Sequence, residues 1–404
     1  MDNKINQPVP VLMYHSVGIP NNRWNWNYLT CPVELFENQL RTLKKKGYKS
    51  IGLPDLYNYI FYSAPIPKKS IVFTFDDGYL DNWVFAYPLM KKYGFQGTIY
   101  VNPEFVDPNP VKRKRMDEVT NVNSLESIGF LSWAEMRQME NDNVMSIESH
   151  ALTHTWYPIS DKIIDYRHPG DKYIWMTWNS HIHKKHSLQI DDENIIDLGE
   201  PVYENGKSLL VKRFFPDERL KRNICDFVSE RGGKTFFKKN NWKEELDEEV
   251  RKYKSIHPLI ERFETDIEYK ERILLELQTT KSIISDKLNK TVDFHCWPGG
   301  SATKIGMVIS DSLGFKLSNV ADDIKEIRYK IKNNNLFLVN RINRFVPLIY
   351  AESNGNHKVK YSRGILLLFQ IMTFTQNRYL AFVFKSLLFL YKHIYRLFYK
   401  LRNR

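Results

Sequence analysis

Residues 71–78 of this chain are Ile71-Val72-Phe73-Thr74-Phe75-Asp76-Asp77-Gly78. The first five are β-branched or aromatic, which predicts a short, buried strand of a parallel sheet. After the two acids, apolar residues from Leu80 to Met90 recur at helical spacing, and Gly94 can end that helix. The carboxylates therefore lie where a strand ends and a helix begins. Open α/β sheets and barrels carry their chemistry at such strand ends.

The two adjacent acids and a pair of histidines further along the chain suggest a metal site. Adjacent carboxylates cannot both ionise cheaply in a dry cleft, so a metal or a function must hold Asp76 and Asp77 there. His150 and His154 are four residues apart, and on a helical turn both imidazoles can reach one ion. By themselves these signals stay ambiguous. Asp-Asp-Gly is often a plain turn, and a histidine pair often lies at the surface or in a core.

Five blocks, taken in order along the chain, resemble polysaccharide deacetylases of the NodB-homology kind (carbohydrate esterase family 4). They are residues 9–17, 71–78, 150–154, 294–300 and 338–342. The first, which contains Tyr14-His15, resembles the opening block of a subgroup that includes deacetylases of surface polysaccharides. The resemblance implies an α/β fold, an irregular (β/α) barrel of about seven strands, and the hydrolysis of N-acetyl groups.

The resemblance also implies roles for individual residues. Asp76 is expected to be the general base, while Asp77, His150 and His154 bind one divalent metal ion. Zinc is the expected metal, and cobalt, nickel and manganese also tolerate such ligands. Three ligands of mixed nitrogen and oxygen type leave positions open for water and substrate, which is typical of catalytic sites. A base beside a metal-activated water can hydrolyse an amide or an ester.

Other positions are less well defined by the sequence. The turn from Trp297 to Gly300 is expected to supply oxyanion donors, because glycines let N–H groups approach closely. His15 is expected near the site by resemblance, and a core position for it is equally compatible. The fourth block, Phe294–Gly300, lacks the arginine that usually orients the base in this family, and no late Leu-x-x-His motif supplies a general acid. His181, His183 and His186 form a second cluster, for which a solvated loop is predicted.

Strands alternating with helices favour parallel α/β units. Further strands are predicted at 97–101, 144–148, 292–296 and 336–339, and helices between Pro32 and Gly47 and over 267–287. Residues 1–355 are expected to form the catalytic domain, with an insertion at about 156–260. Within the insertion, Asn205-Gly206 predicts a hairpin turn. Its aromatic residues, Trp175, Trp178 and Trp242 among them, can shape a glycan cleft or simply pack a small subdomain.

Composition adds broader limits. The chain has 404 residues with globular apolar and charged fractions. Its three cysteines, Cys31, Cys225 and Cys296, are widely spaced and indicate no disulfide framework. The first eight residues contain no apolar signal-peptide core, so a cytoplasmic location is expected.

Residues 356–404 differ from the rest in charge. After Glu352 there are ten cations and no acid, and they supply ten of the net +12 charges. The remainder of the chain is nearly neutral, so no nucleic-acid partner is expected. Lys385, Lys392, Arg396 and Lys400 follow one helical stripe, and the apolar runs are shorter than the ~18 residues of a membrane span. Residues 363–404 therefore predict a basic amphipathic helix on an anionic membrane surface. The alternative is a helix hairpin packed on the barrel or on a partner.

These observations predict a metal-dependent carbohydrate N-deacetylase, peripheral on the inner face of the cell membrane. Its expected substrate is an N-acetylated glycan or a lipid-linked sugar in surface polysaccharide or glycolipid biosynthesis. One alternative is the removal of a different acyl group, or of a formyl group, from a lipid-linked sugar. Another is a catalytically silent glycan-binding scaffold that keeps the barrel. The sequence determines neither the sugar and its linkage nor the general acid.

Overall fold

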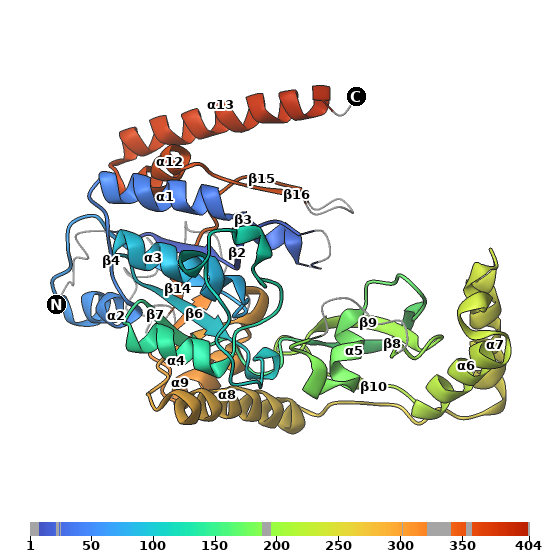
Figure 1. The fold of residues 1–404 in the computed structure, drawn as a ribbon. Helices are drawn as coiled ribbons and strands as arrows, with labels where there is room; N and C mark the ends of the chain where they lie inside the picture. The colour runs from blue at the N-terminus through green and yellow to red at the C-terminus, as the bar shows by residue number, and fades with distance from the viewer. Residues whose placement is uncertain are drawn as a thin grey trace. The chain divides into compact units, whose positions relative to one another are not determined.

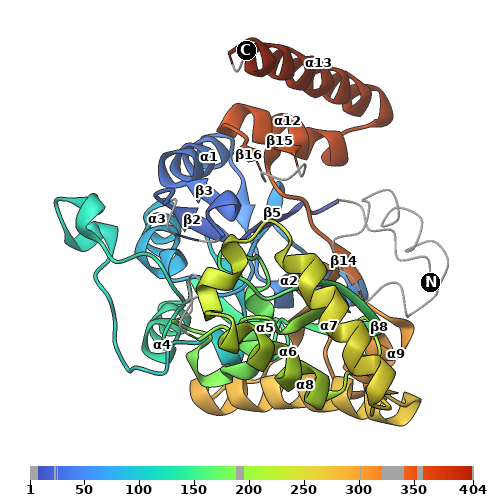
Figure 2. The same cartoon turned by 90° about the vertical axis from the view of Figure 1, so that its right-hand side faces the viewer.

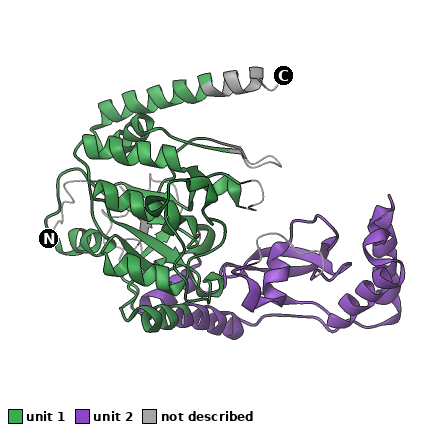
Figure 3. Ribbon diagram, in the orientation of Figure 1, with its two compact units in different colours: residues 1–151, 280–300, 314–404 green, residues 152–279, 301–313 purple. Residues whose placement is uncertain are grey.

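A computed structural model of the chain describes residues 8–21, 24, 26–187, 195–300, 302–320, 341–352 and 358–402. The chain divides into two compact units, which Figure 3 distinguishes by colour. The first unit comprises residues 1–151, 280–300 and 314–404, and the second comprises residues 152–279 and 301–313. Each unit is described separately below.

A parallel sheet forms the centre of the first unit (Figure 1). Its strand order is β1-β5-β6-β7-β12-β13-β14, with β4 paired to β5, and all the pairings among these described strands are parallel. The bounds are β1 Val11–Tyr14, β4 Lys49–Ser50, β5 Ser70–Phe75, β6 Gly97–Val101, β7 Met145–Ser149, β12 Phe294–Cys296, β13 Leu317–Val320 and β14 Arg341–Asn343. Just past β14, Phe345 forms a parallel bridge with Leu12 of β1. The two ends of the sheet therefore meet, which confirms the predicted irregular barrel.

The strand that carries the acids forms as its composition predicts. All six residues of β5 are buried, as are all five of β6 beside it. The helix predicted after the acids is also present, although its first turn is a wide π-type turn at Asn82–Ala86. The α-helical part, α3, spans Tyr87–Tyr93 and ends at Gly94, whose φ of 66° is left-handed.

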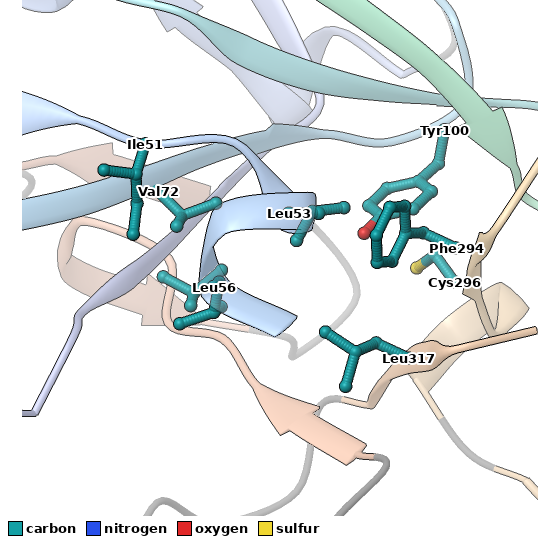
Figure 4. Close-up of a cluster of buried hydrophobic side chains, with 9 residues drawn as sticks. Ile51, Leu53, Leu56, Val72, Tyr100, Phe294, Cys296 and Leu317 are labelled. Carbon is teal, nitrogen blue, oxygen red and sulfur yellow. The ribbon is translucent and has the colours of Figure 1, made fainter. Parts of the chain in front are cut away.

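A hydrophobic cluster fills one part of the barrel unit (Figure 4). Its buried members are Val11, Ile51, Leu53, Leu56, Val72, Tyr100, Phe294, Cys296 and Leu317. Ile51 lies just after β4, and the others come from β1, β5, β6, β12, β13 and the helix α2, which spans Leu53–Tyr62. Side chains far apart in sequence thus hold neighbouring strands in register, and Cys296 belongs both to this core and to the site described below.

The other helices of the first unit pack outside the sheet. They are α1 Val33–Lys45, α4 Trp133–Asn141, α12 Gly364–Thr375 and α13 Arg378–Arg402, with α8 Asp266–Leu288 shared between the units. Two small pairings accompany them: β2 Ser16–Gly18 with β3 Thr30–Pro32, and β15 Leu348–Glu352 with β16 Lys358–Tyr361. The helices predicted from Pro32 and over 267–287 correspond to α1 and α8. The predicted strand at 336–339 lies outside the described residues.

The first half of residues 356–404, which were expected to form a basic amphipathic tail, packs on the barrel unit. Tyr361 is buried, stacks on Tyr14 of β1 and donates from its hydroxyl to the carbonyl of Leu29. Helix α12 lies between α1 and α13 (Figures 1 and 2). At Gly364, the first residue of α12, an added Cβ would lie 2.6 Å from the Cβ of Thr42 on α1. This close approach requires glycine and joins α12 to the barrel unit.

The second unit contains a two-stranded sheet, a short strand pair and several helices. Their bounds are β8 Trp156–Tyr166, β9 Pro201–Lys207, β10 Phe214–Phe215, β11 Arg262–Phe263, α5 Ile174–Ser180, α6 Glu218–Glu230, α7 Trp242–Ile256 and α9 Lys304–Ser312. The predicted hairpin turn at Asn205-Gly206 is wrong, because both residues lie inside β9, opposite Pro158 and Tyr157 of β8. Gly206 serves close packing instead, since a Cβ there would lie 2.7 Å from Val211 Cγ1.

The tryptophans of this unit mainly pack it. Trp175 and Trp178 are buried, and Trp242 lies against the rings of His168 and Phe237, with centroids 5.2 Å apart in both pairs. The packing interpretation therefore holds for these three. Among the described helices of the whole chain, none has the length and apolarity to cross a bilayer.

Candidate active site

Asp76 and Asp77, at the end of β5, have different surroundings because the backbone turns sharply from Asp77 onward. Asp77 has φ 72° and Gly78 has φ 69°, both left-handed. A Cβ on Gly78 would lie 2.9 Å from Val101 Cγ1, so glycine is required there for space as well as for conformation. The same conformation strains a non-glycine residue such as Asp77, and such strain is common at functional sites.

Asp77 lies close to His150 and His154, the two histidines predicted as metal ligands. One ligand atom from each of Asp77, His150 and His154 lies within 4.8 Å of the other two. The Nε2 atom of His150 lies 3.2 Å from Asp77 Oδ1, and its Nδ1 lies 2.8 Å from the carbonyl oxygen of Cys296. Because a carbonyl only accepts hydrogen bonds, Nδ1 carries the proton and Nε2 is left as the ligand atom. A backbone carbonyl behind an imidazole is a common support for a metal-binding histidine.

The loop that carries the histidines begins directly after β7. The N–H of His150 donates to the carbonyl of Val101 at 2.9 Å, and the side-chain amide of Asn102 donates to the carbonyls of His150 and Ala151. Ala151 and His154 have positive φ values of 62° and 42°. His154 follows His150 by only four residues, so the two stay close along the chain.

Asp76 is held by an arginine. Asp76 is buried. Arg344 Nη1 donates to Asp76 Oδ1 at 2.5 Å and Arg344 Nη2 donates to Oδ2 at 2.7 Å, which makes a bidentate ion pair. Arg344 is itself buried, and its Nη1 also donates to Thr74 Oγ1 at 3.1 Å. Burial pushes the pKa of Asp76 up, but the charge and hydrogen bonds of Arg344 outweigh it, so that this pKa lies below its ordinary value.

A second group that could hold a metal consists of Asp76, His150 and Cys296. This group fits a cation poorly. Arg344 already occupies both oxygens of Asp76 and approaches Cys296 Sγ to 2.9 Å. Burial also raises the pKa of the Cys296 thiol, which opposes the thiolate form that metals bind. The donor set of Asp77, His150 and His154 is the better fit for a zinc-like ion.

The structure also places the less well-defined residues. His15 follows β1 directly, and its Nε2 lies 3.9 Å from Asp76 Oδ2, which is the neighbourhood expected for it. Trp297 is fully buried, and its backbone N–H donates to the carbonyl of Asn319 at 3.2 Å. The N–H of Gly300 donates back to Trp297 at 2.8 Å. These two N–H groups are therefore committed to the fold, and oxyanion donors in this turn stay a prediction.

The histidine cluster at 181–186 contains one surprise. His183 is exposed and His181 and His186 are half-buried, in keeping with the predicted loop, but Lys185 between them is only 1% exposed. The prediction of a solvated segment is therefore wrong for this lysine, because its ammonium group lies 3.0 Å from the carbonyl oxygen of Thr153 and donates to it.

Sequence reasoning missed Arg344. The arginine is absent from the fourth block, at Phe294–Gly300, where the family pattern places it. It stands instead two residues beyond Ile342, the last residue of the fifth block, 268 positions from its partner Asp76. The sequence signal that could have indicated its role is its place directly after β14, the strand that closes the barrel. Because β14 continues toward β1, and β1 pairs with β5, Arg344 reaches the end of β5.

Comparison with known proteins gives a family match for part of the chain. Residues 63–181 match the family model described as polysaccharide deacetylase. This part of the chain is therefore similar to the polysaccharide deacetylases. It includes Asp76, Asp77, His150 and His154, whereas the Trp297 turn and Arg344 lie outside the matched range. The resemblance drawn from the sequence is thereby confirmed.

Individual relatives match parts of the chain. YxkH of Bacillus subtilis, named as a polysaccharide deacetylase, is 29% identical over 146 residues, which is 36% of this chain and 43% of that protein. The poly-β-1,6-N-acetyl-D-glucosamine N-deacetylase of Escherichia coli K12 is 19% identical over 72% of this chain and 30% of its own length. The chain thus matches less than half the length of either relative. A solved de-N-acetylase from Aggregatibacter actinomycetemcomitans shares 15% identity, with a TM-score of 0.49, over 84% of this chain and 94% of that one.

Proposed function

We propose that this chain is a metal-dependent carbohydrate N-deacetylase. The observation that carries the proposal is the division between two adjacent carboxylates at the end of β5. Asp77 lies with two histidines in a group that could hold a metal, and Asp76 lies beside it in a two-pronged pair with Arg344. A base next to a metal site is the arrangement that amide hydrolysis requires.

The residues of the chain divide the chemistry as follows. A divalent ion at Asp77, His150 and His154 would supply Lewis-acid polarisation of a carbonyl and lower the pKa of water from about 15.7 to about 7. Asp76, kept ionised by Arg344, accepts the proton of the attacking water. The amide C–N bond then breaks, which releases acetate, and the nitrogen stays on the sugar as an amine. His15, close to Asp76, is the candidate for delivering the proton that this amine requires.

The substrate class follows from the relatives. The Escherichia coli relative is named for poly-β-1,6-N-acetyl-D-glucosamine, and the matched family acts on polysaccharides. We therefore propose an N-acetylated glycan as substrate, or an N-acetylated sugar carried on a lipid. Zinc is the proposed metal, because its preferred ligands include both imidazole and carboxylate.

Acetate release tests this proposal. The full chain would be stripped with a chelator and supplied separately with zinc, cobalt, nickel or manganese, on a panel of β-1,6- and β-1,4-linked N-acetylglucosamine oligomers. We expect metal-dependent acetate release from at least one of them. Metal binding without release of any acyl group from the panel would favour the silent glycan-binding scaffold. Release of formate or a longer acid from acylated analogues alone would favour the alternative deacylase or deformylase.

We further propose that helix α13 attaches the enzyme to an anionic membrane surface. Phe384 packs against Phe369 of α12, but a neighbouring face of α13 leaves Leu380, Leu387, Leu390 and Ile394 each 44–57% exposed. Residues 353–404 carry ten cations and no acid, and anionic lipid adds about 1 kcal/mol per suitably placed cation. An exposed apolar face on a cationic helix is typical of interfacial binding. The cytoplasmic side of the membrane stays the predicted location.

A further inference from the structure

Thr153, the residue before the ligand His154, is held from both ends of its backbone. Its N–H donates to Glu276 Oε1 at 3.1 Å, and its hydroxyl donates to the same oxygen at 2.7 Å. Its carbonyl accepts a hydrogen bond from Lys185 Nζ at 3.0 Å. Glu276 belongs to α8, and Lys185 follows the short 3-10 helix Ile182–Lys184 within the insertion. All of these residues belong to the second unit.

Both holding groups are charged and almost completely buried. Lys185 is 1% exposed and Glu276 is 4% exposed. Burying an ammonium or a carboxylate is unfavourable unless the group is well hydrogen-bonded and its charge is balanced. A threonine backbone alone could be satisfied by neutral groups or by water. The use of two buried charges of opposite sign on one residue therefore indicates that its position matters.

Lys185 and Glu276 together determine the position of His154. The carbonyl of Thr153 and the N–H of His154 belong to the same peptide bond. His154 has a left-handed φ of 42°, which is unfavourable for a non-glycine residue and persists only when its surroundings enforce it. Lys185 therefore fixes the plane of the peptide that enters His154, and Glu276 fixes the residue before it. This differs from His150, whose imidazole is held directly by the Cys296 carbonyl.

We propose that Lys185 and Glu276 are positioning residues that set the affinity of the metal site by holding His154 in its left-handed conformation. The inference rests on the proposed function in one respect, the assignment of His154 as a metal ligand. It gives the insertion a specific role, because one of its buried side chains supports the loop that carries a metal ligand. Groups that support metal ligands commonly change affinity by about 10–100-fold when they are removed.

The test compares metal affinity with the stability of the metal-free protein. Zinc and cobalt dissociation constants would be measured by competition titration for Lys185→Met and Glu276→Ala in the full chain. The matched controls are Lys184→Met and Glu271→Ala, which alter exposed residues of the same two segments. We expect each test variant to bind metal on the order of 10–100-fold more weakly and the controls to bind like wild type. Cobalt absorption, which reports ligand geometry, should also change in the test variants alone.

Conservative variants keep the inference testable if a deletion unfolds the chain. Lys185→Arg retains a donor and Glu276→Gln retains an acceptor, so both should restore affinity toward wild type. A lower melting temperature of the metal-free protein with unchanged metal affinity would show a purely structural role and overturn the inference. If wild type itself bound no metal, the proposed function would fail first, so the two failures are distinguishable.

Discussion

The metal side and the base side of the site are built in different ways. Asp77, His150 and His154 lie in two short loops that follow β5 and β7. These loops contain four left-handed residues, which are Asp77, Gly78, Ala151 and His154. Asp76 on the base side is instead buried in a charge pair with Arg344, which arrives from the far end of the sheet. The metal side is thus defined by local motifs, whereas the base side exists only once the barrel has closed.

This difference predicts that the two sides can be damaged separately. Removing a metal ligand should leave the Asp76–Arg344 pair intact, and removing Arg344 should leave the metal ligands in place. The experiments below are ordered from the largest expected effect on activity to the smallest, and the first two test that separation directly.

The largest effect is expected from the ligands. His150→Ala and His154→Ala should each abolish tight metal binding, because two remaining ligands cannot hold the ion as three do. The metal-free proteins should still fold, since the base side is unchanged. Metal content after dialysis measures metal binding, and thermal unfolding shows whether the variants fold. His183→Ala, at an exposed histidine, is the control. Stoichiometric metal in both ligand variants would contradict the assignment.

Arg344→Met should damage only the base side. It leaves the buried Asp76 carboxylate unpaired, which costs about 3–5 kcal/mol of stability for a buried ion pair. Acetate release should fall on the order of 10–100-fold, because the base loses its orientation, while metal affinity should stay near wild type. Arg344→Lys keeps the charge but not the two-pronged geometry, and should be intermediate. An equal loss of metal affinity would show that the two sides are coupled.

Two truncations ask whether either side depends on the C-terminal helices. Ending the chain after Gln376 removes α13 and should reduce co-sedimentation with anionic vesicles while leaving acetate release from a soluble substrate unchanged. High salt should weaken the attachment of the full chain only in part, because it screens charges but not apolar contacts.

Ending the chain after Ser362 also removes α12, whose buried side chains are Leu366, Leu367, Leu368 and Ile371. This should lower stability by several kcal/mol, at about 1.5–3 kcal/mol per buried side chain. If both truncations partitioned onto vesicles like the full chain, the membrane proposal would be wrong. An unchanged melting temperature after the longer deletion would contradict the packing role of α12.

The smallest effect concerns Asp81, four residues beyond Asp77. Burial raises the pKa of Asp81 to about 7, and its side chain accepts a hydrogen bond from Ser16. The folded state therefore holds a proton that the unfolded state releases near pH 4, so stability should fall as pH rises through about 7. The expected loss between pH 5 and 8 is roughly 2 kcal/mol. Burial also raises the pKa of Glu148 to about 7, so urea unfolding of Asp81→Asn should show a shallower pH dependence than wild type. An unchanged pH dependence would contradict the role given to Asp81.

Much of the barrel could be predicted from the sequence because its signals are local. A fully buried strand followed by Asp-Asp-Gly, a helix ended by Gly94 and a histidine pair after a strand all depend on neighbouring residues. The same reasoning failed at Asn205-Gly206, where pairing with β8 overrode the turn preference of the dipeptide.

The features that escaped prediction depend on contacts between distant parts of the chain. Arg344 lies beside Asp76 only because the chain after β14 returns to β1. Charge and hydropathy grouped α12 with α13, because they do not reveal that Gly364 lets α12 approach α1 closely. Lys185 lies in a polar stretch of sequence, and its contact with the distant Thr153 carbonyl cannot be read from its neighbours.

The most direct test of the account is to measure metal content and acetate release on the same samples of wild type and Asp76→Asn. The account assigns metal binding to Asp77 and proton acceptance to Asp76. Both proteins should therefore hold one equivalent of metal, while the variant should release acetate on the order of 10²-fold more slowly or worse. Acetate release by Asp76→Asn at the wild-type rate would contradict the assignment of Asp76 as the base and, with it, the separation of the two sides of the site.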